Sequence, residues 1–261
     1  ETFSEAWQAF SGAPQVLRQE MEYDKRRDPD KYRHIWEGDY QELSDRQLIN
    51  SAWVESARKR KVDASPADEV TMGVDVARYG DDETVIAFRR GRDAYSEPWV
   101  VLRKLDTMET AARIASHYDR VKPNALFVDE TGVGAGVVDR LKQLGYPVIA
   151  VNFASSPDGL TDAKTANKRA EMWVRMREWL KGTVGLPDDD RLEAELTSVE
   201  YKHDANNAIL LERKEDMKKR GLPSPDRGDA LALTFAYPVT KLTDTWEQHR
   251  GPDGRSDATG Y

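Results

Sequence analysis

Hydrophobic and polar residues alternate with a period of two over residues 69–77, which is typical of a β-strand. Two further strands are predicted at 83–90 and near 98–105, each preceded by a turn rich in Gly, Asp or Ser (RYGDD and RGRDAYSE). Three strands joined by short turns predict an antiparallel meander. The first strand contains Asp75, although burying an unpaired carboxylate is energetically costly.

The following segments alternate between helix and strand. An amphipathic helix is predicted at about 108–120, and then a short apolar strand at 124–130. A helix at 136–144 leads to another buried strand at 146–151, which predicts parallel pairing. Later in the chain we expect helices at about 167–181, 188–198 and 226–237, with a hairpin before the last of them. A meander followed by parallel strands in one mixed sheet flanked by helices is the order of the ribonuclease H-like α/β fold.

The two ends of the chain differ from its centre. Residues 1–66 are rich in Trp, Tyr, Arg and Glu, lack strand alternation and end in the linker-like DASPADE. We therefore expect a helical and extended linker over 1–66, a core domain over 67–240 and a polar, disordered tail over 241–261. Because the chain begins at Glu1 without a methionine, we also expect it to be a fragment of a longer protein.

Composition narrows the possible chemistry. The 261 residues include no cysteine, which excludes disulfides and thiolate metal sites, and the four histidines lack the spacing of a zinc site. Any bound metal must therefore be held by carboxylates. The net charge of −8 argues mildly against bulk nucleic-acid binding, although acidic residues that hold cations reverse the local field. No apolar run approaches the roughly 18 residues of a membrane span, so we expect a soluble protein.

Four aspartates stand out by position. Asp75 lies within the first strand and Asp129 ends the apolar strand at 124–130, while Asp226 and Asp229 lie three apart at the start of the last helix. In the inferred fold these segments meet, so their carboxylates would converge and need hard cations such as Mg²⁺ or Mn²⁺. Alternatives remain open at this point. Asp226 suits a helix N-cap, Asp229 suits a first-turn acid and Asp129 suits a turn cap.

Three blocks containing these aspartates resemble the nuclease domain of bacteriophage large terminase subunits: GVDVARYGDDETVIAFRRG, LFVDETGVGAGVVDRL and PDRGDALALTFA. The stretch KYRHIWEGDYQE also resembles the segment that joins ATPase to nuclease in that family. The resemblance implies a ribonuclease H-like, metal-dependent endonuclease that cuts concatemeric double-stranded viral DNA at the start and end of packaging. It implies Asp75, Asp129 and Asp229 as the catalytic triad, with Asp82 and Asp226 as accessory metal ligands.

Such a site uses two Mg²⁺ or Mn²⁺ ions, which we expect Asp75 to bridge, to activate a water and stabilise the leaving 3′ oxygen. Duplex DNA would be held through its phosphates. The resemblance of NKRAEMWVRMREW to the helix flanking the family's site suggests Lys168 and Arg169 as phosphate ligands. Two basic clusters add further candidates: Arg89, Arg90, Lys218 and Lys219.

The resemblance also implies partners and a location. We expect the portal protein and the small terminase subunit as partners, in the cytoplasm of an infected bacterium and not in the mature virion. The sequence contains no G-x-x-x-x-G-K-[ST] loop, so the packaging ATPase is missing from this chain.

Other interpretations remain. The glycines of TGVGAG do not have the spacing of a dinucleotide fingerprint. An actin-like or sugar-kinase-like ATPase shares the inferred fold but would need a second half with its own GxD-type hairpin. A non-catalytic docking module with structural acids is the third interpretation. Metal-dependent DNA cleavage separates the three.

Overall fold

The computed structural model describes residue 22 and residues 46–77 and 83–239. Asp82 and the predicted tail at 241–261 lie outside the described residues. The chain divides into two compact units, Glu1–Arg46 and Gln47–Tyr261, and every helix and strand bounded below belongs to the second. None of the helices in the described part of the chain is long and apolar enough to cross a membrane.

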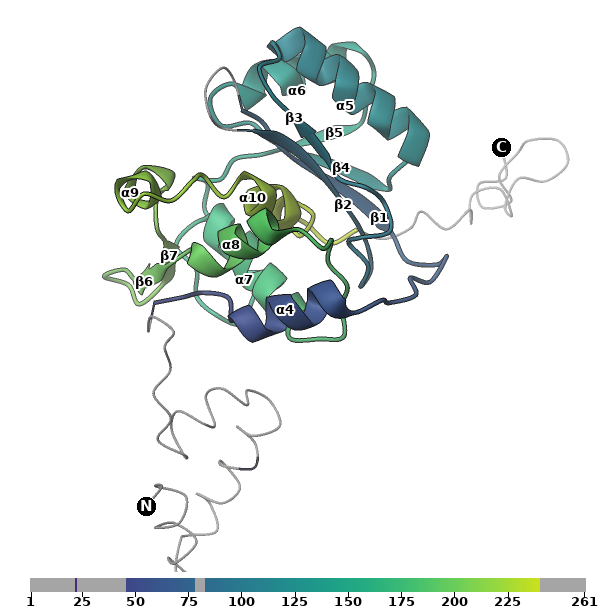
Figure 1. Ribbon diagram of the computed structural model, residues 1–261. Coiled ribbons are helices and arrows are strands. Elements are labelled where there is room, and N and C mark those ends of the chain that lie inside the picture. Colours follow the sequence, from purple (N-terminus) through teal and green to yellow (C-terminus); the bar gives the residue numbers. More distant parts are fainter. Residues whose placement is uncertain (1–21, 23–45, 78–82, 240–261) are drawn as a thin grey trace, which may run out of the picture. The chain divides into compact units, whose positions relative to one another are not determined.

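A five-stranded mixed sheet forms the centre of the second unit, in the order β3-β2-β1-β4-β5 (Figure 1). β1 pairs antiparallel with β2, and β2 with β3, whereas β1–β4 and β4–β5 are parallel. The predicted meander and the parallel strands after it are therefore confirmed. The strands are β1 Val70–Asp75, β2 Thr84–Arg90, β3 Val100–Leu102, β4 Ala125–Asp129 and β5 Val148–Val151.

Helices follow the sequence prediction with two differences. They are α4 Ser51–Lys59, α5 Thr107–Val121, α6 Gly134–Gln143, α7 Lys168–Leu180, α8 Asp190–Ser198, α9 Lys214–Lys219 and α10 Asp226–Leu233, and the hairpin consists of β6 Tyr201–His203 and β7 Ile209–Leu211. The short α9 was not predicted. α10 ends before the predicted residue 237, because the amides of residues 234–236 turn to the tighter i−3 bonding pattern and the Thr234 hydroxyl donates to the Leu231 carbonyl.

The two faces of the sheet have different covers. α5 and α6 pack on one face, where Met72 and Val74 of β1 are fully buried (Figure 1). Burying such side chains contributes roughly 1.5–3 kcal/mol each. α10 lies on the other face, with α7 and α8 packed behind it. Gly73 permits this close approach, since a Cβ there would lie 2.2 Å from the Ala230 carbonyl oxygen. Asp75 is on this second face, under the start of α10.

Helix α4 belongs to the unit that holds the sheet. Its N-cap is Asn50, its buried residues are Val54 and Ala57, and it packs against α7 and α8. Leu186 also donates a backbone hydrogen bond to the Ala57 carbonyl, at 3.1 Å. The compact unit that holds the sheet starts at Gln47, inside the segment 1–66 for which the sequence predicts a linker.

Candidate active site

The central strands bring two aspartates together at one edge of the sheet. β1 and β4 are parallel and end at Asp75 and Asp129, and their register pairs Val74 with Val128. The next residue on each strand is an aspartate, so the two carboxylates lie side by side on the α10 face. Both are buried, with exposed fractions of 3% and 7%. Asp129 is held in place by the Thr131 amide, which donates to its Oδ1 at 2.9 Å.

The first turn of α10 adds two more carboxylates. Asp226 and Asp229 are 1% and 0% exposed. The proposed N-cap role of Asp226 was wrong, because Pro225 is the N-cap and Asp226 is the first helical residue. Its Oδ2 instead accepts a 2.8 Å hydrogen bond from the amide of Glu83, next to β2. Asp226 thereby ties α10 to the start of that strand.

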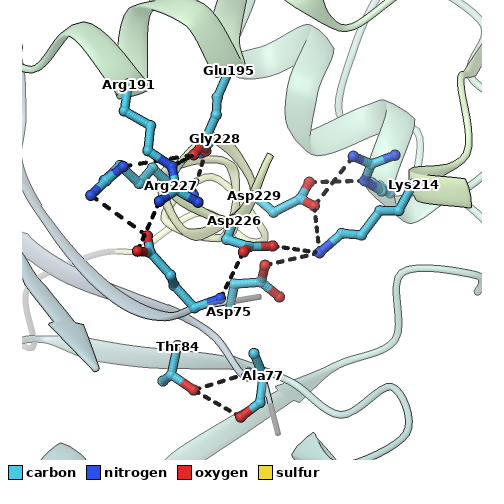
Figure 2. A network of polar contacts seen from close by, with 12 residues as sticks. Asp75, Ala77, Thr84, Arg191, Glu195, Lys214, Asp226, Arg227, Gly228 and Asp229 are labelled. Carbon is cyan, nitrogen blue, oxygen red and sulfur yellow. Dashed lines mark hydrogen bonds and ion pairs between the residues drawn. The ribbon is translucent and has the colours of Figure 1, made fainter. Parts of the chain in front are cut away.

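A lysine contacts three of these four carboxylates (Figure 2). Lys214 Nζ is 3.0 Å from Oδ2 of Asp75 and 3.1 Å from Oδ2 of Asp229. Its distance to Oδ1 of Asp226 is 3.5 Å. Lys214 opens α9, so the helix that the sequence pattern did not predict delivers a cation into the acidic cluster.

Asp229 is the most tightly held of the four. The Arg169 guanidinium donates through Nε to Oδ1 at 2.8 Å and through its NH2 group to Oδ2 at 3.2 Å. The indole Nε1 of Trp173 also donates to Oδ1, at 2.8 Å. Both donors come from α7, so this helix fixes the orientation of the Asp229 carboxylate. A charge-assisted fork of this kind is among the stronger protein hydrogen-bonding arrangements.

The carboxylates differ in proton affinity. Burial raises the pKa of Asp75 well above its usual range, Lys214 opposes this, and the neighbouring aspartates add to it. Burial also raises the pKa of Asp129, against hydrogen bonds from Thr131. For Asp229, burial is outweighed by Arg169, Lys214 and the Trp173 hydrogen bond, so its pKa is lowered. The pKa of Lys214 is raised, because the three carboxylates it contacts outweigh its burial.

The donor set suits a hard divalent cation. Four carboxylates on rigid elements offer only oxygen ligands, which Mg²⁺ and Mn²⁺ favour. Within residues 46–77 and 83–239, no group of three or more carboxylates or histidines is spaced ready to hold a metal ion. The Lys214 ammonium lies among three of the four carboxylates, where it partly offsets their negative charge.

Solved structures of similar fold include nuclease domains of phage large terminase subunits. The nuclease domain of the large terminase subunit gp2 of bacterial virus Sf6 is 24% identical, with a TM-score of 0.62 over 74% of this chain and 99% of that one. A mutant of that domain solved with manganese is 21% identical, with a TM-score of 0.60 over 73% and 99%. The large terminase nuclease from thermophilic phage G20c with bound magnesium is 15% identical, with a TM-score of 0.54 over 74% and 98%.

The fold is that of the terminase nuclease domains. The predicted ribonuclease H-like class, with its mixed sheet flanked by helices, is thus confirmed. No protein-family model and no curated protein matches the sequence.

Two of the basic residues that the sequence suggested as phosphate ligands, Lys168 and Arg169, are paired with carboxylates inside the protein. Lys168 is fully buried, and its Nζ lies 2.6 Å from Asp158 and 2.8 Å from Glu171. Arg169 is engaged by Asp229, as described above. These placements do not favour phosphate contacts by either residue.

The other four basic candidates divide between two places. Arg89 and Arg90 are at the end of β2 that pairs with Thr71 and Val70, remote from the end of β1 that carries the carboxylate. Arg89 turns inward and donates to the Thr234 hydroxyl at 2.9 Å, and burial lowers its pKa to about 10. Lys218 and Lys219 are exposed on α9, the helix that also carries Lys214.

Sequence reasoning missed three functional candidates in this site. Lys214 is part of the basic run RKEDMKKR, whose composition suggests a solvated surface. Trp173 follows Arg169 by one helical turn, and this i, i+4 spacing was the one available sign that the two share a face. Glu195 of α8 accepts hydrogen bonds from the first turn of α10, and nothing in its local sequence distinguishes it from the other acids of that helix.

Proposed function

We propose that this chain is a divalent-metal-dependent endonuclease that cuts concatemeric double-stranded viral DNA during genome packaging. The observation that carries the proposal is that three buried aspartates, from β1 and α10, surround one cation position, with the buried Asp129 of β4 next to Asp75. Holding so many carboxylates together costs folding free energy, so a protein retains them when they bind something. The shared fold with phage terminase nucleases, solved with manganese or magnesium, supports the same function.

In this proposal Asp75, Asp129 and Asp229 are the catalytic triad and Asp226 is an accessory ligand. When bound, Mg²⁺ or Mn²⁺ supplies Lewis acidity and lowers the pKa of a coordinated water for attack on a phosphodiester. Two such ions are part of the proposal, and so is Asp82, which lies outside the described residues. Arg169 and Trp173 orient one triad member before any ion arrives, which reduces the reorganisation needed on binding.

Lys214 has a separate role in the proposal. In the structure its ammonium offsets part of the negative charge of the carboxylates. With a divalent cation bound, the carboxylates would no longer need the Lys214 ammonium for charge compensation, so the side chain would be free to leave the cluster.

The substrate and partners follow from the same proposal. Duplex DNA would be contacted through its phosphates. Lys218 and Lys219 are candidates for these contacts, because they are exposed on α9, the helix that also carries Lys214. Arg89 and Arg90 remain weaker candidates at the far end of β2. The portal protein, the small terminase subunit and the packaging ATPase are the proposed partners, in the cytoplasm of an infected bacterium.

Cleavage of supercoiled plasmid tests the proposal. We expect nicked and linear products with Mg²⁺ or Mn²⁺ and none with EDTA. Asp139→Asn is the matched control, because Asp139 is an exposed aspartate of α6 on the other side of the sheet. ATP hydrolysis without DNA cleavage would favour the actin-like alternative. Neither activity, with a folded protein, would favour the docking module. In the described residues the single five-stranded sheet and one two-stranded hairpin do not supply the second half that the ATPase alternative requires.

A further inference from the structure

The first turn of α10 is not capped by its own sequence. Pro225, the N-cap residue, has no side chain that can accept a hydrogen bond, and the Asp226 carboxylate turns away to the Glu83 amide. The first amides of a helix need acceptors, above all where they are buried. Here those amides belong to the helix that carries two of the four clustered aspartates.

Glu195 of α8 supplies the missing acceptor. Its Oε2 accepts from the Arg227 amide at 2.7 Å and from the Gly228 amide at 3.2 Å, across 32 and 33 residues of sequence (Figure 2). Its other oxygen, Oε1, accepts from Arg191 Nε at 3.1 Å. The residue is 1% exposed, so this carboxylate is fully used inside the protein and meets no solvent.

The side chain of Arg227 extends this connection. Its Nε lies 3.2 Å from Asp189 Oδ2, and its NH2 group lies 3.6 Å from Glu83 Oε2. Glu83 in turn donates its amide to Asp226. The start of α8, the start of α10 and the residue before β2 are therefore joined in one polar network behind the aspartates. Glu83 is fully buried and also pairs with Arg191, whose NH1 group is 2.8 Å from Oε1.

We infer that Glu195 is a positioning residue of the site, which fixes the first turn of α10 and thereby the direction of the Asp226 and Asp229 carboxylates. The inference rests on the proposed function for what those carboxylates bind. The cap itself, formed by Glu195 and the amides of Arg227 and Gly228, is present in the fold whatever the carboxylates bind. Glu195 faces the backbone of α10, so the effect of its loss must reach the metal through the position of that helix.

Three variants separate this role from simple stability. Glu195→Ala removes the acceptor, and Glu195→Met does so while filling a similar volume. Glu195→Gln keeps a carbonyl oxygen for the two amides. Glu193→Gln is the matched control, since Glu193 is on the same helix but pairs with Arg58, away from α10.

Two measurements decide the outcome. Hydrogen–deuterium exchange reports the amides of Arg227 and Gly228, and Mn²⁺-induced thermal stabilisation reports metal affinity without any turnover. We expect Ala and Met to speed exchange in the first turn of α10 and to weaken Mn²⁺ binding by about 10- to 100-fold, the usual cost of losing an outer-shell partner. Gln should restore both to near the wild-type level, and the cleavage rate should follow metal affinity.

Unchanged exchange, or unchanged Mn²⁺ affinity, in a folded Ala or Met variant would overturn the inference. A Gln variant as defective as Ala would also overturn it, because the carbonyl acceptor would then not be what matters. If the wild type neither binds Mn²⁺ nor cleaves DNA, the proposed function fails. In that case normal exchange at Arg227 and Gly228 in the Ala variant would still refute the cap.

Discussion

The Nζ atom of Lys214 lies 3.0 Å from Oδ2 of Asp75, so an ammonium group and a strand aspartate meet where the sheet, α9 and α10 converge. The same ammonium is within 3.5 Å of Asp226 and 3.1 Å of Asp229. The protein therefore carries its own monovalent cation in a site whose ligands suit a divalent one. The balance between these two cations gives the first prediction.

Lys214→Ala should lower the melting temperature of the metal-free protein and enlarge the stabilisation that Mn²⁺ provides. Without the ammonium, the carboxylates repel each other, and losing one partner of a buried ion pair costs roughly 3 kcal/mol. Metal would then bind without displacing a competitor, and its binding energy would add to stability through linkage. Thermal denaturation with and without Mn²⁺ measures both effects. Lys219→Ala, on the exposed side of α9, is the control, and an equal Mn²⁺ response in the two variants would refute competition.

Asp75→Asn should abolish cleavage and stabilise the metal-free protein. The raised pKa means that the folded state disfavours the charged form of Asp75. Its contribution to stability is therefore adverse at pH values above its folded pKa and disappears at acid pH, where the carboxyl is protonated in both states. The neutral amide removes this cost, so we expect a gain on the order of 1 kcal/mol, or about 2–4 °C, near pH 8. A lower melting temperature at that pH would show that Asp75 is a net stabilising partner of Lys214.

Asp229→Asn should have the opposite effect on stability. The pKa of Asp229 is lowered, so its charge stabilises the fold above its usual pKa of 3.8, and this contribution is lost as the pH falls through the folded value. The amide leaves the Arg169 guanidinium without its carboxylate, so near pH 7 we expect a loss of about 3–5 kcal/mol together with loss of cleavage. Denaturant unfolding of Asp75→Asn and Asp229→Asn side by side provides the test. Equal effects of the two changes would contradict the contrast that the structure shows between these aspartates.

Glu195→Gln should become more favourable relative to wild type as the pH rises. Burial raises the pKa of Glu195 from its usual 4.5 to about 7, against hydrogen bonds from the amides of Gly228 and Arg227. Between these values the unfolded state releases the proton first, so wild-type stability falls by on the order of 3 kcal/mol. Gln cannot titrate, and the difference in melting temperature between variant and wild type should grow from about pH 5 to about pH 8. A constant difference would mean that Glu195 is ionised throughout this range.

The sheet and its order were predictable because hydrophobic periodicity reports directly which residues are buried. Asp75 was recognisable as a candidate site residue for the same reason, since a carboxylate in an apolar strand has few structural explanations. Asp129 could be placed beside it once parallel pairing was inferred. The position of each strand and its pairing with the next strand can both be predicted from local hydrophobic patterns.

Contacts between distant segments could not be predicted in this way. Lys214 enters the cluster because it is the first residue of the unpredicted α9 and its side chain reaches Asp75, Asp226 and Asp229, and a lysine in a basic run gives no sign of that. Asp226 after Pro225 suits an N-cap by sequence, but the cap comes from Glu195 on another helix. The resemblance suggested Lys168 as a phosphate ligand, whereas in the structure its side chain is buried and paired with the carboxylates of Asp158 and Glu171. Each of these differences arises from tertiary packing that overrides a local preference.

We propose that the aspartates around Lys214 form a metal-dependent DNA-cleaving site. The most direct measurement of this activity is the conversion of supercoiled plasmid to nicked and linear forms by the purified chain, titrated with Mn²⁺ or Mg²⁺, beside Asp75→Asn and Asp139→Asn. We expect metal-dependent cleavage by the wild type and by Asp139→Asn, and no cleavage by Asp75→Asn at any metal concentration. Cleavage by Asp75→Asn at saturating Mn²⁺, or no cleavage by the folded wild type with either metal, would contradict this proposal.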